Sequence, residues 1–225
     1  MAKSALSVFL TSSIGKKVVM GATGLFLISF LVIHAYINAM IFYNDNGATF
    51  LSYAHFMGTN PIIRTMEIGL AAGILAHIIQ GLTLWAQNKA KRPVKYNVNG
   101  SGKNTNWYSR SMGLLGTLIL IFLILHWYHF WIPNRYAQFT TGHELNMYEA
   151  MQIAFSELWV VIIYTLGCIS LAWHLIHGFW SAFQTFGLSN KKYKKLIRTI
   201  GVIYAVIINL VFIAMPWSMY LGCLK

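Results

Sequence analysis

Charge is scarce in this chain, and negative charge is the scarcer kind. Only 10% of the 225 residues are charged, and five Asp and Glu stand against 17 Lys and Arg. A soluble domain usually carries about 25% charged residues, so the composition argues against an ordinary water-soluble fold. Hydrophobic residues make up 57% of the chain and the mean hydropathy is +0.57, which indicates a protein whose surface faces lipid.

Cysteine is nearly absent, and so are the common cofactor motifs. Cys168 and Cys223 form no C-x-x-C or C-x-x-C-H pattern, which argues against covalently attached haem and against an iron–sulfur centre held by this chain alone. Neither a dinucleotide fingerprint nor a P-loop is present, because "NGSGKN" lacks the required spacing. The polar stretch 97–106 is expected to be a linker.

What the chain does have is apolar runs long enough to cross a bilayer core, which takes about 20 helical residues. Each is expected to be a helix, because an open strand cannot satisfy its backbone hydrogen bonds in lipid. We therefore predict an all-α integral membrane protein with one transmembrane domain over residues 1–225 and no separate soluble domain. The five predicted helices cover residues 18–43, 62–85, 112–132, 158–183 and 197–217.

The net charge of +12 follows the ends of these helices rather than forming a nucleic-acid site. Fourteen of the 17 basic residues precede the first helix or lie in the second–third and fourth–fifth connections. The acidic residues lie at the opposite ends: Asp45, Glu67, Glu144, Glu149 and Glu157. Positive residues favour the inner side of a membrane, so the N-terminus is predicted inside and the C-terminus outside.

Four histidines fall inside predicted helices. His34, His77, His126 and His174 lie one in each of the first four, and the fifth helix has none. Helical rise places the first and third about 15 and 10 Å from the outer surface, and the second and fourth about 24 and 25 Å. Ionisable residues at such depth are rare and mark functional sites. The depths define an outer pair (His34 and His126) and an inner pair (His77 and His174).

Two histidines on different helices at one depth can hold a flat metal macrocycle between them. A single buried histidine is more often hydrogen-bonded to a neighbouring helix, but four in matched pairs favour the cofactor. Zinc is the weaker alternative, since it needs a compact set with Cys or carboxylate ligands. His129 and His177, each three residues after a candidate ligand, are predicted to support the site through hydrogen bonds, for example to propionates.

Small residues on the first three helices could admit a planar ligand. The alternative is ordinary close packing of helices, for which the same residues serve equally well. They are Gly21, Ala22, Gly24, Gly69, Gly73, Gly113 and Gly116.

Five segments, in order, resemble the di-haem cytochrome b membrane subunit of succinate dehydrogenases and fumarate reductases (succinate:quinone oxidoreductases, respiratory complex II). The resemblance runs from about Ser13 to Gly187. The segments are "FLVIHAYIN", "AHFMGTNPIIRTMEIGL", "AHIIQGLTLWAQNKA", "GTLILIFLILHWYHFW" and "HLIHGFWSAFQTFG".

The resemblance implies that His34, His77, His126 and His174 are the axial ligands of two b haems in a four-helix core, with a fifth helix beside it. It also implies a soluble flavoprotein subunit that holds the succinate/fumarate active site. An iron–sulfur subunit would dock on the inner face and exchange electrons with membrane quinone, either menaquinone or ubiquinone, through this chain. The expected location is the bacterial cytoplasmic membrane.

A quinone site needs a group that exchanges protons. Glu67 is the acid that lies clearly within a predicted helix, about 9 Å from its outer end, and His55 precedes it. We predict that these two residues line an outer quinone site. Glu67 could instead pair with Arg64, and a rival inner pocket lies near Ser13, Lys16 and Arg110.

Two other interpretations stay open. The chain could be the cytochrome b of another respiratory enzyme, of the hydrogenase or formate dehydrogenase type, which shares the haem chemistry but not "AHFM" or "HGFWSAFQT". It could also be a transporter or proton channel with a histidine relay. Transporters usually contain inverted repeats or broken helices, and the sequence has no clear repeat.

Overall fold

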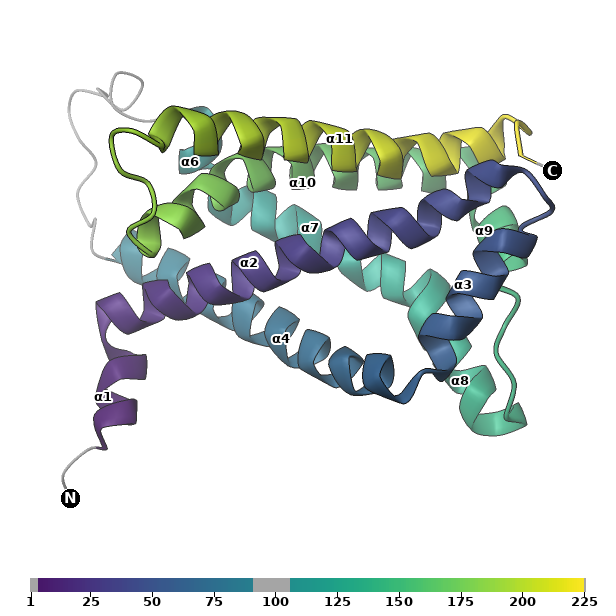
Figure 1. Cartoon of the computed structure of the whole chain (residues 1–225), viewed down its shortest axis with the longest axis horizontal. Coiled ribbons are helices and arrows are strands. Elements are labelled where there is room, and N and C mark those ends of the chain that lie inside the picture. The colour runs from purple at the N-terminus through teal and green to yellow at the C-terminus, as the bar shows by residue number, and fades with distance from the viewer. Residues whose placement is uncertain (1–3, 91–105, 225) are drawn as a thin grey trace.

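The computed structural model describes residues 4–90 and 106–224, and every regular element in these ranges is helical (Figure 1). Five helical segments are long and apolar enough to cross a membrane, so this part of the chain is that of a multi-pass membrane protein. The prediction of an all-helical chain with five helices long and apolar enough to span a membrane is confirmed. The long helices are α2 (Ser13–Asn38, continued by the 3-10 turn η1, Ala39–Tyr43), α4 (Pro61–Ala90), α7 (Met112–His126), α10 (Leu158–Thr185) and α11 (Lys194–Tyr220).

Shorter helices gather at the two ends of the bundle. At one end lie α1 (Ala5–Thr11) and α6 (Trp107–Arg110), together with Lys191–Lys195 before α11. At the other lie α3 (Ala48–Thr59), α8 (Ile132–Thr141) and α9 (Met147–Phe155), with most of the acidic residues (Figure 1). We call these the basic end and the acidic end. The described chain starts at the basic end and finishes at the acidic end, as an odd number of crossings requires.

The third long helix does not end near Ile132, as predicted, but continues to Thr141. Pro133 lacks an N–H, and in a regular α-helix its ring would clash with the carbonyl four residues earlier. The π-helical turn η2 (Trp127–Trp131) lies at this point, immediately after His126. A π turn widens the helix locally, so the chain passes the proline and carries α8 beyond it.

Polar side chains start the shorter helices. The Asn146 side chain accepts hydrogen bonds from the backbone N–H groups of Tyr148 and Glu149 at the start of α9. Asp45 accepts from both the backbone N–H and the hydroxyl of Thr49 at the start of α3. The hydroxyl hydrogen bond lowers the pKa of the Asp45 carboxyl below its usual value. These caps fix where the short helices of the acidic end begin.

The helices differ in how much they bury. In Figure 1, α10 and α11 run side by side, while α2 crosses the bundle obliquely between them and α4. The main cluster of buried residues lies at the acidic end and includes Ile41, Phe50, Phe155, Val161 and Tyr164. None of the residues of α4 is buried, although it contacts α2, α3 and α7. Helix α4 is therefore a peripheral helix that packs mainly against α2 and leaves its other side exposed.

Candidate functional site

The rings of His34 on α2 and His126 on α7 lie next to each other. Their centroids are 5.8 Å apart and the ring planes are nearly perpendicular, at 86°. Phe30 stacks on His34 with centroids 5.2 Å apart, and Phe122 stacks on His126 at 5.8 Å. Each phenylalanine is one helical turn before its histidine, so the same helix that carries the imidazole also limits its rotation.

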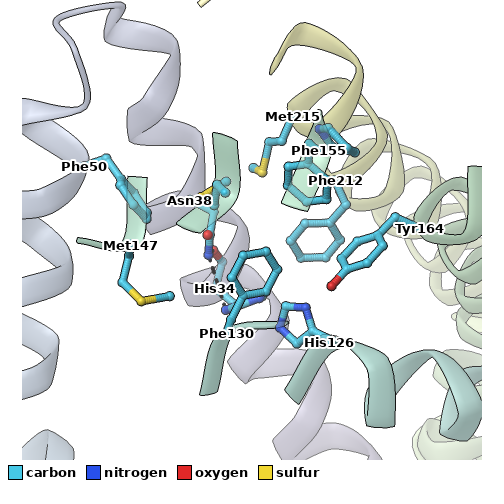
Figure 2. Close-up of a pocket in the computed structure, with 12 residues that line it drawn as sticks. His34, Asn38, Phe50, His126, Phe130, Met147, Phe155, Tyr164, Phe212 and Met215 are labelled. Atoms are coloured by element: carbon cyan, nitrogen blue, oxygen red, sulfur yellow. Dashed lines mark hydrogen bonds between the residues drawn. The ribbon is translucent and has the colours of Figure 1, made fainter. Parts of the chain in front are cut away.

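A cavity of about 150 Å³ opens beside these two rings (Figure 2). Figure 2 shows His34, His126 and Phe130 close together, with Tyr164 and Phe212 alongside. Thioether and aromatic side chains make a lining suited to the apolar face of a flat macrocycle. The cavity is lined by His34, Asn38, Phe50, His126, Phe130, Met147, Met151, Phe155, Tyr164, Phe212, Met215 and Pro216.

The rings of His77 on α4 and His174 on α10 form a second pair. Their centroids are 6.2 Å apart, at an interplanar angle of 67°. The hydroxyl of Thr23 on α2 lies 3.1 Å from Nδ1 of His77. Three helices therefore meet at this pair, and His77 is where the peripheral helix α4 approaches α10. The structure thus brings together the two pairs expected from depth, and their role as haem ligands stays a prediction.

The spacing of the two rings in each pair is compatible with a metal held between them. An imidazole nitrogen binds a transition metal at about 2 Å, so two rings that share one metal from opposite sides have centroids roughly 6 Å apart. Nδ1 of His126 and of His174 is buried without a hydrogen-bond partner. Within residues 4–90 and 106–224, no hydrogen bond uses Nε2 of any of the four histidines. Each of the four rings therefore keeps one nitrogen without a hydrogen bond to a described residue, which a metal could use.

Two of the seven small residues lie against the His77–His174 pair. A Cβ built on Gly24 would lie 3.6 Å from Cε1 of His77, and one on Gly116 would lie 3.9 Å from Cε1 of His174. By contrast, a Cβ on Gly73 would press on Phe26, and one on Gly21 on Phe186, so those glycines serve helix packing. Gly69 has no such neighbour within 4 Å.

Glu67 on α4 is held by charged and polar side chains from two helices. Arg135 Nη2 lies 2.8 Å from each carboxylate oxygen, and Arg135 Nε lies 3.1 Å from Oε1. Trp131 Nε1 donates to Oε1 at 2.7 Å, and Arg64 Nη1 donates to Oε2 at 2.5 Å. The pairing with Arg64 that the sequence left open is present, and Arg135 adds a bidentate contact from α8.

His55 does not contact Glu67. Its Nδ1 lies 3.2 Å from Glu144 Oε2, and its side chain is 70% exposed. Gln138 joins the two acidic sites, because it accepts from Arg135 and donates to Glu144 Oε1 at 2.9 Å. The two predicted quinone-site residues are thus the ends of one hydrogen-bonded network across α3, α4 and α8.

Sequence reasoning missed Arg135, because the predicted helix stopped before Pro133. The available signal was its charge: among the described residues, Arg64 and Arg135 are the cations of the otherwise acidic end. A basic residue that departs from the charge pattern of its side of the membrane is a good candidate for an ion pair.

The remaining predicted residues have these surroundings. His129 Nδ1 lies 3.0 Å from the hydroxyl of Tyr164, and the two rings stack with centroids 5.8 Å apart. The ring of His177 faces that of Tyr108 of α6, with centroids 6.3 Å apart.

The residues of the rival inner pocket lie at the basic end. Lys16 donates to Gln87 of α4, while Ser13 begins α2 and Arg110 ends α6. Of the basic residues at the predicted inner ends of the helices, Lys3, Lys91, Arg92, Lys95 and Lys103 lie outside the described residues, as does most of the linker 97–106.

The described ranges contain no group of three or more His, Cys, Asp and Glu side chains arranged to hold a metal ion. Comparison of the chain with models of protein families, with curated proteins and with solved structures finds no match.

Proposed function

We propose that the chain is the membrane cytochrome b subunit of a succinate dehydrogenase or fumarate reductase, and that it carries electrons between soluble partner subunits and a membrane quinone. The observation that supports this most is the pair of histidine contacts, His34–His126 and His77–His174. Each joins two different helices, and the pairs lie at two levels of one bundle. Two cofactors placed in this way would form an electron path along the bundle axis.

In this proposal the four histidines are axial ligands of two non-covalent b haems. Such a haem would supply a one-electron carrier whose potential depends on ligation, hydrogen bonds and burial. The Thr23 hydroxyl would fix the orientation of the His77 ring through Nδ1, and Asn38, whose side-chain nitrogen is 3.4 Å from Nδ1 of His34, would do the same there. The rings of Phe30 and Phe122, which stack on His34 and His126, would hold these two imidazoles in place and exclude water.

The charge pattern supports the orientation and the partners. With the basic end inside, exposed lysines before α11 form a surface for soluble subunits on that side. We infer that an iron–sulfur subunit and a flavoprotein subunit dock there, and that the flavoprotein carries the succinate/fumarate active site. The chain itself would be the electron-transfer and quinone-reacting part of the enzyme, in the bacterial cytoplasmic membrane.

The quinone would react at the outer, acidic end, near the His34–His126 pair. A second haem at this pair would extend the electron path to the outer end, and that extension is needed only if electrons enter or leave there. Glu67 and His55 were the candidates from the sequence for this site. Both carboxylate oxygens of Glu67 are engaged by arginines. A quinone oxygen that used this carboxylate would have to displace one of these hydrogen bonds.

The test is purification from native membranes in mild detergent, followed by haem extraction and spectroscopy. The proposal predicts two extractable b haems per chain, bound flavin, two co-purifying polypeptides, and reduction of the haems by succinate. Reduction of the haems by hydrogen or formate but not by succinate would indicate that the chain belongs to another respiratory enzyme. A chain without haem would contradict the proposal outright.

A further inference from the structure

A groove of about 480 Å³ lies on the outside of the bundle at the acidic end, between the π turn, α9 and the start of α10. Pockets that hold small ligands typically measure about 300–1,000 Å³, so the groove is large enough for a substituted six-membered ring. It is separate from Glu67, Arg135 and His55, none of which lines it.

A histidine and a carboxylate are among the residues that line this mostly apolar groove, His129 and Glu157. His129 already uses Nδ1 in the contact with the Tyr164 hydroxyl, which leaves Nε2 for a ligand. The carboxylate of Glu157 makes no hydrogen bond or ion pair with any described residue. The groove therefore offers a nitrogen and a carboxylate, both without partners inside the described structure.

The rim shows from which side a ligand would enter. Tyr128 and Ile153 are each 66% exposed and Trp159 is 55% exposed, so the outward edge of the groove is aromatic and aliphatic. Aromatic side chains of this kind mark the membrane–water interface. A ligand that enters past them comes from the lipid, with its polar groups toward the two polar side chains.

The groove is also connected to the His34–His126 pair. The ring of Tyr164 stacks on His129 and lies 6.1 Å from the ring of His126. Tyr164 also lines the cavity beside the pair. A ligand at His129 is thus one aromatic side chain away from the proposed electron carrier.

We propose that this groove is the quinone site. The ring would lie between the π turn and α9, one oxygen would be hydrogen-bonded to Nε2 of His129, and protons would exchange with Glu157. This assignment rests on the proposed function for its electron source. Reduction of the quinone adds two electrons, which arrive through the His34–His126 pair, and two protons, and it converts two C=O groups into C–OH groups. Oxidation of the quinol reverses each change. Glu67 then joins α4 to α8 and does not contact the quinone.

Photolabelling of the purified complex with an azido-quinone tests the assignment, with labelled peptides located by mass spectrometry. Label on Tyr128, on His129 or in residues 150–160, removed by excess short-chain quinone, is the expected result. Label near Glu67 and Arg135, label at the basic end, or label that short-chain quinone does not displace would overturn it. The last outcome would mean that the groove holds an ordinary lipid.

A groove-filling variant gives a second measurement. Ile153→Trp should lower both labelling and quinone-linked turnover at least about tenfold, a cost of ~1.4 kcal/mol in binding. Ile162→Trp, which enlarges an exposed aliphatic residue of α10 outside the groove, should change neither. Haem content and succinate oxidation by a soluble dye should be normal in both variants. Absence of haem and of succinate oxidation in the unaltered complex would refute the proposed function. Labelling of the groove would still report whether quinone binds there.

Discussion

Arg135 on α8 holds Glu67 on α4 with its guanidinium, with Nη2 at 2.8 Å from both carboxylate oxygens. The two residues are separated by 68 positions in the sequence, and the Arg135 side chain is only 15% exposed. Because no residue of α4 is buried, this ion pair is a principal attachment of α4 at the acidic end. It also fixes the start of the helix that carries His77.

Substitution of Arg135 by Gln should loosen this attachment. Hydrogen bonds to charged groups contribute about 1.5–3 kcal/mol each, and partial exposure of Glu67 reduces the loss to roughly 1–3 kcal/mol in total. We expect a lower melting temperature in detergent, measured by intrinsic tryptophan fluorescence or by light scattering. Arg135→Lys should recover only part of the loss, because an ammonium cannot form the bidentate contact.

Arg64→Gln is the matched control for this experiment. Arg64 binds the same carboxylate, but it lies on the same helix, three residues away, and is more exposed. Its removal leaves the α4–α8 contact in place, so stability should fall by less than about 1 kcal/mol. Equal effects of the two substitutions would show that the contact between helices adds nothing.

Loss of haem from histidine variants should follow the two pairs. His34→Ala and His126→Ala should each remove one spectral component, and His77→Ala and His174→Ala the other, as measured by reduced-minus-oxidised spectra and a pyridine haemochrome count. His143→Ala is the control, because His143 lies in the exposed connection between α8 and α9. If His34→Ala and His174→Ala removed the same component, the proposed pairs would be wrong.

Bulky substitutions beside the His77–His174 pair should exclude a haem by steric clash, without removing a ligand. The side chain added in Gly24→Leu or Gly116→Leu would point toward Cε1 of His77 or His174 and occupy the room needed by a planar ligand. We expect selective loss of one haem, with both histidines unchanged. Gly69→Leu should retain two haems, because no neighbour lies within 4 Å of the added Cβ. Retention of both haems in the Gly24 and Gly116 variants would place the macrocycle elsewhere.

The orientation can be read from the two native cysteines. Cys223 is exposed at the acidic end, whereas Cys168 is buried in α10. With the N-terminus inside, a membrane-impermeant maleimide should label Cys223 in right-side-out vesicles without permeabilisation, and Cys223→Ser should abolish the signal. Labelling that requires permeabilisation would reverse the proposed topology.

The sequence predicted the long helices well, because a bilayer imposes one requirement on every crossing segment: about 20 apolar residues in helical form. It also predicted which histidines meet, since depth along a helix follows from residue number. What it could not predict were contacts that depend on side-chain reach across helices. Arg135 was missed because a proline was read as a helix end, and His55 was placed with Glu67 although Glu144 is its partner. The groove at His129 could not be predicted at all, because it depends on where α9 packs.

Assembly with soluble subunits should depend on the lysines of the basic end. Lys191, Lys192, Lys194 and Lys195 all lie exposed immediately before or at the start of α11. Conversion of two of them, Lys191 and Lys194, to Glu should weaken docking of an acidic partner surface, because charge complementarity governs such encounters. The expected result is loss of flavin and of the two partner polypeptides on purification, with both haems retained. The difference between the variant and the unaltered complex should shrink as salt is raised, because the Debye length falls to about 8 Å near physiological ionic strength and exposed charges are increasingly screened. Thr140→Glu, which adds negative charge at the acidic end, should leave the complex intact. Dissociation in the Thr140 variant but not in the lysine variant would place the partner on the opposite face.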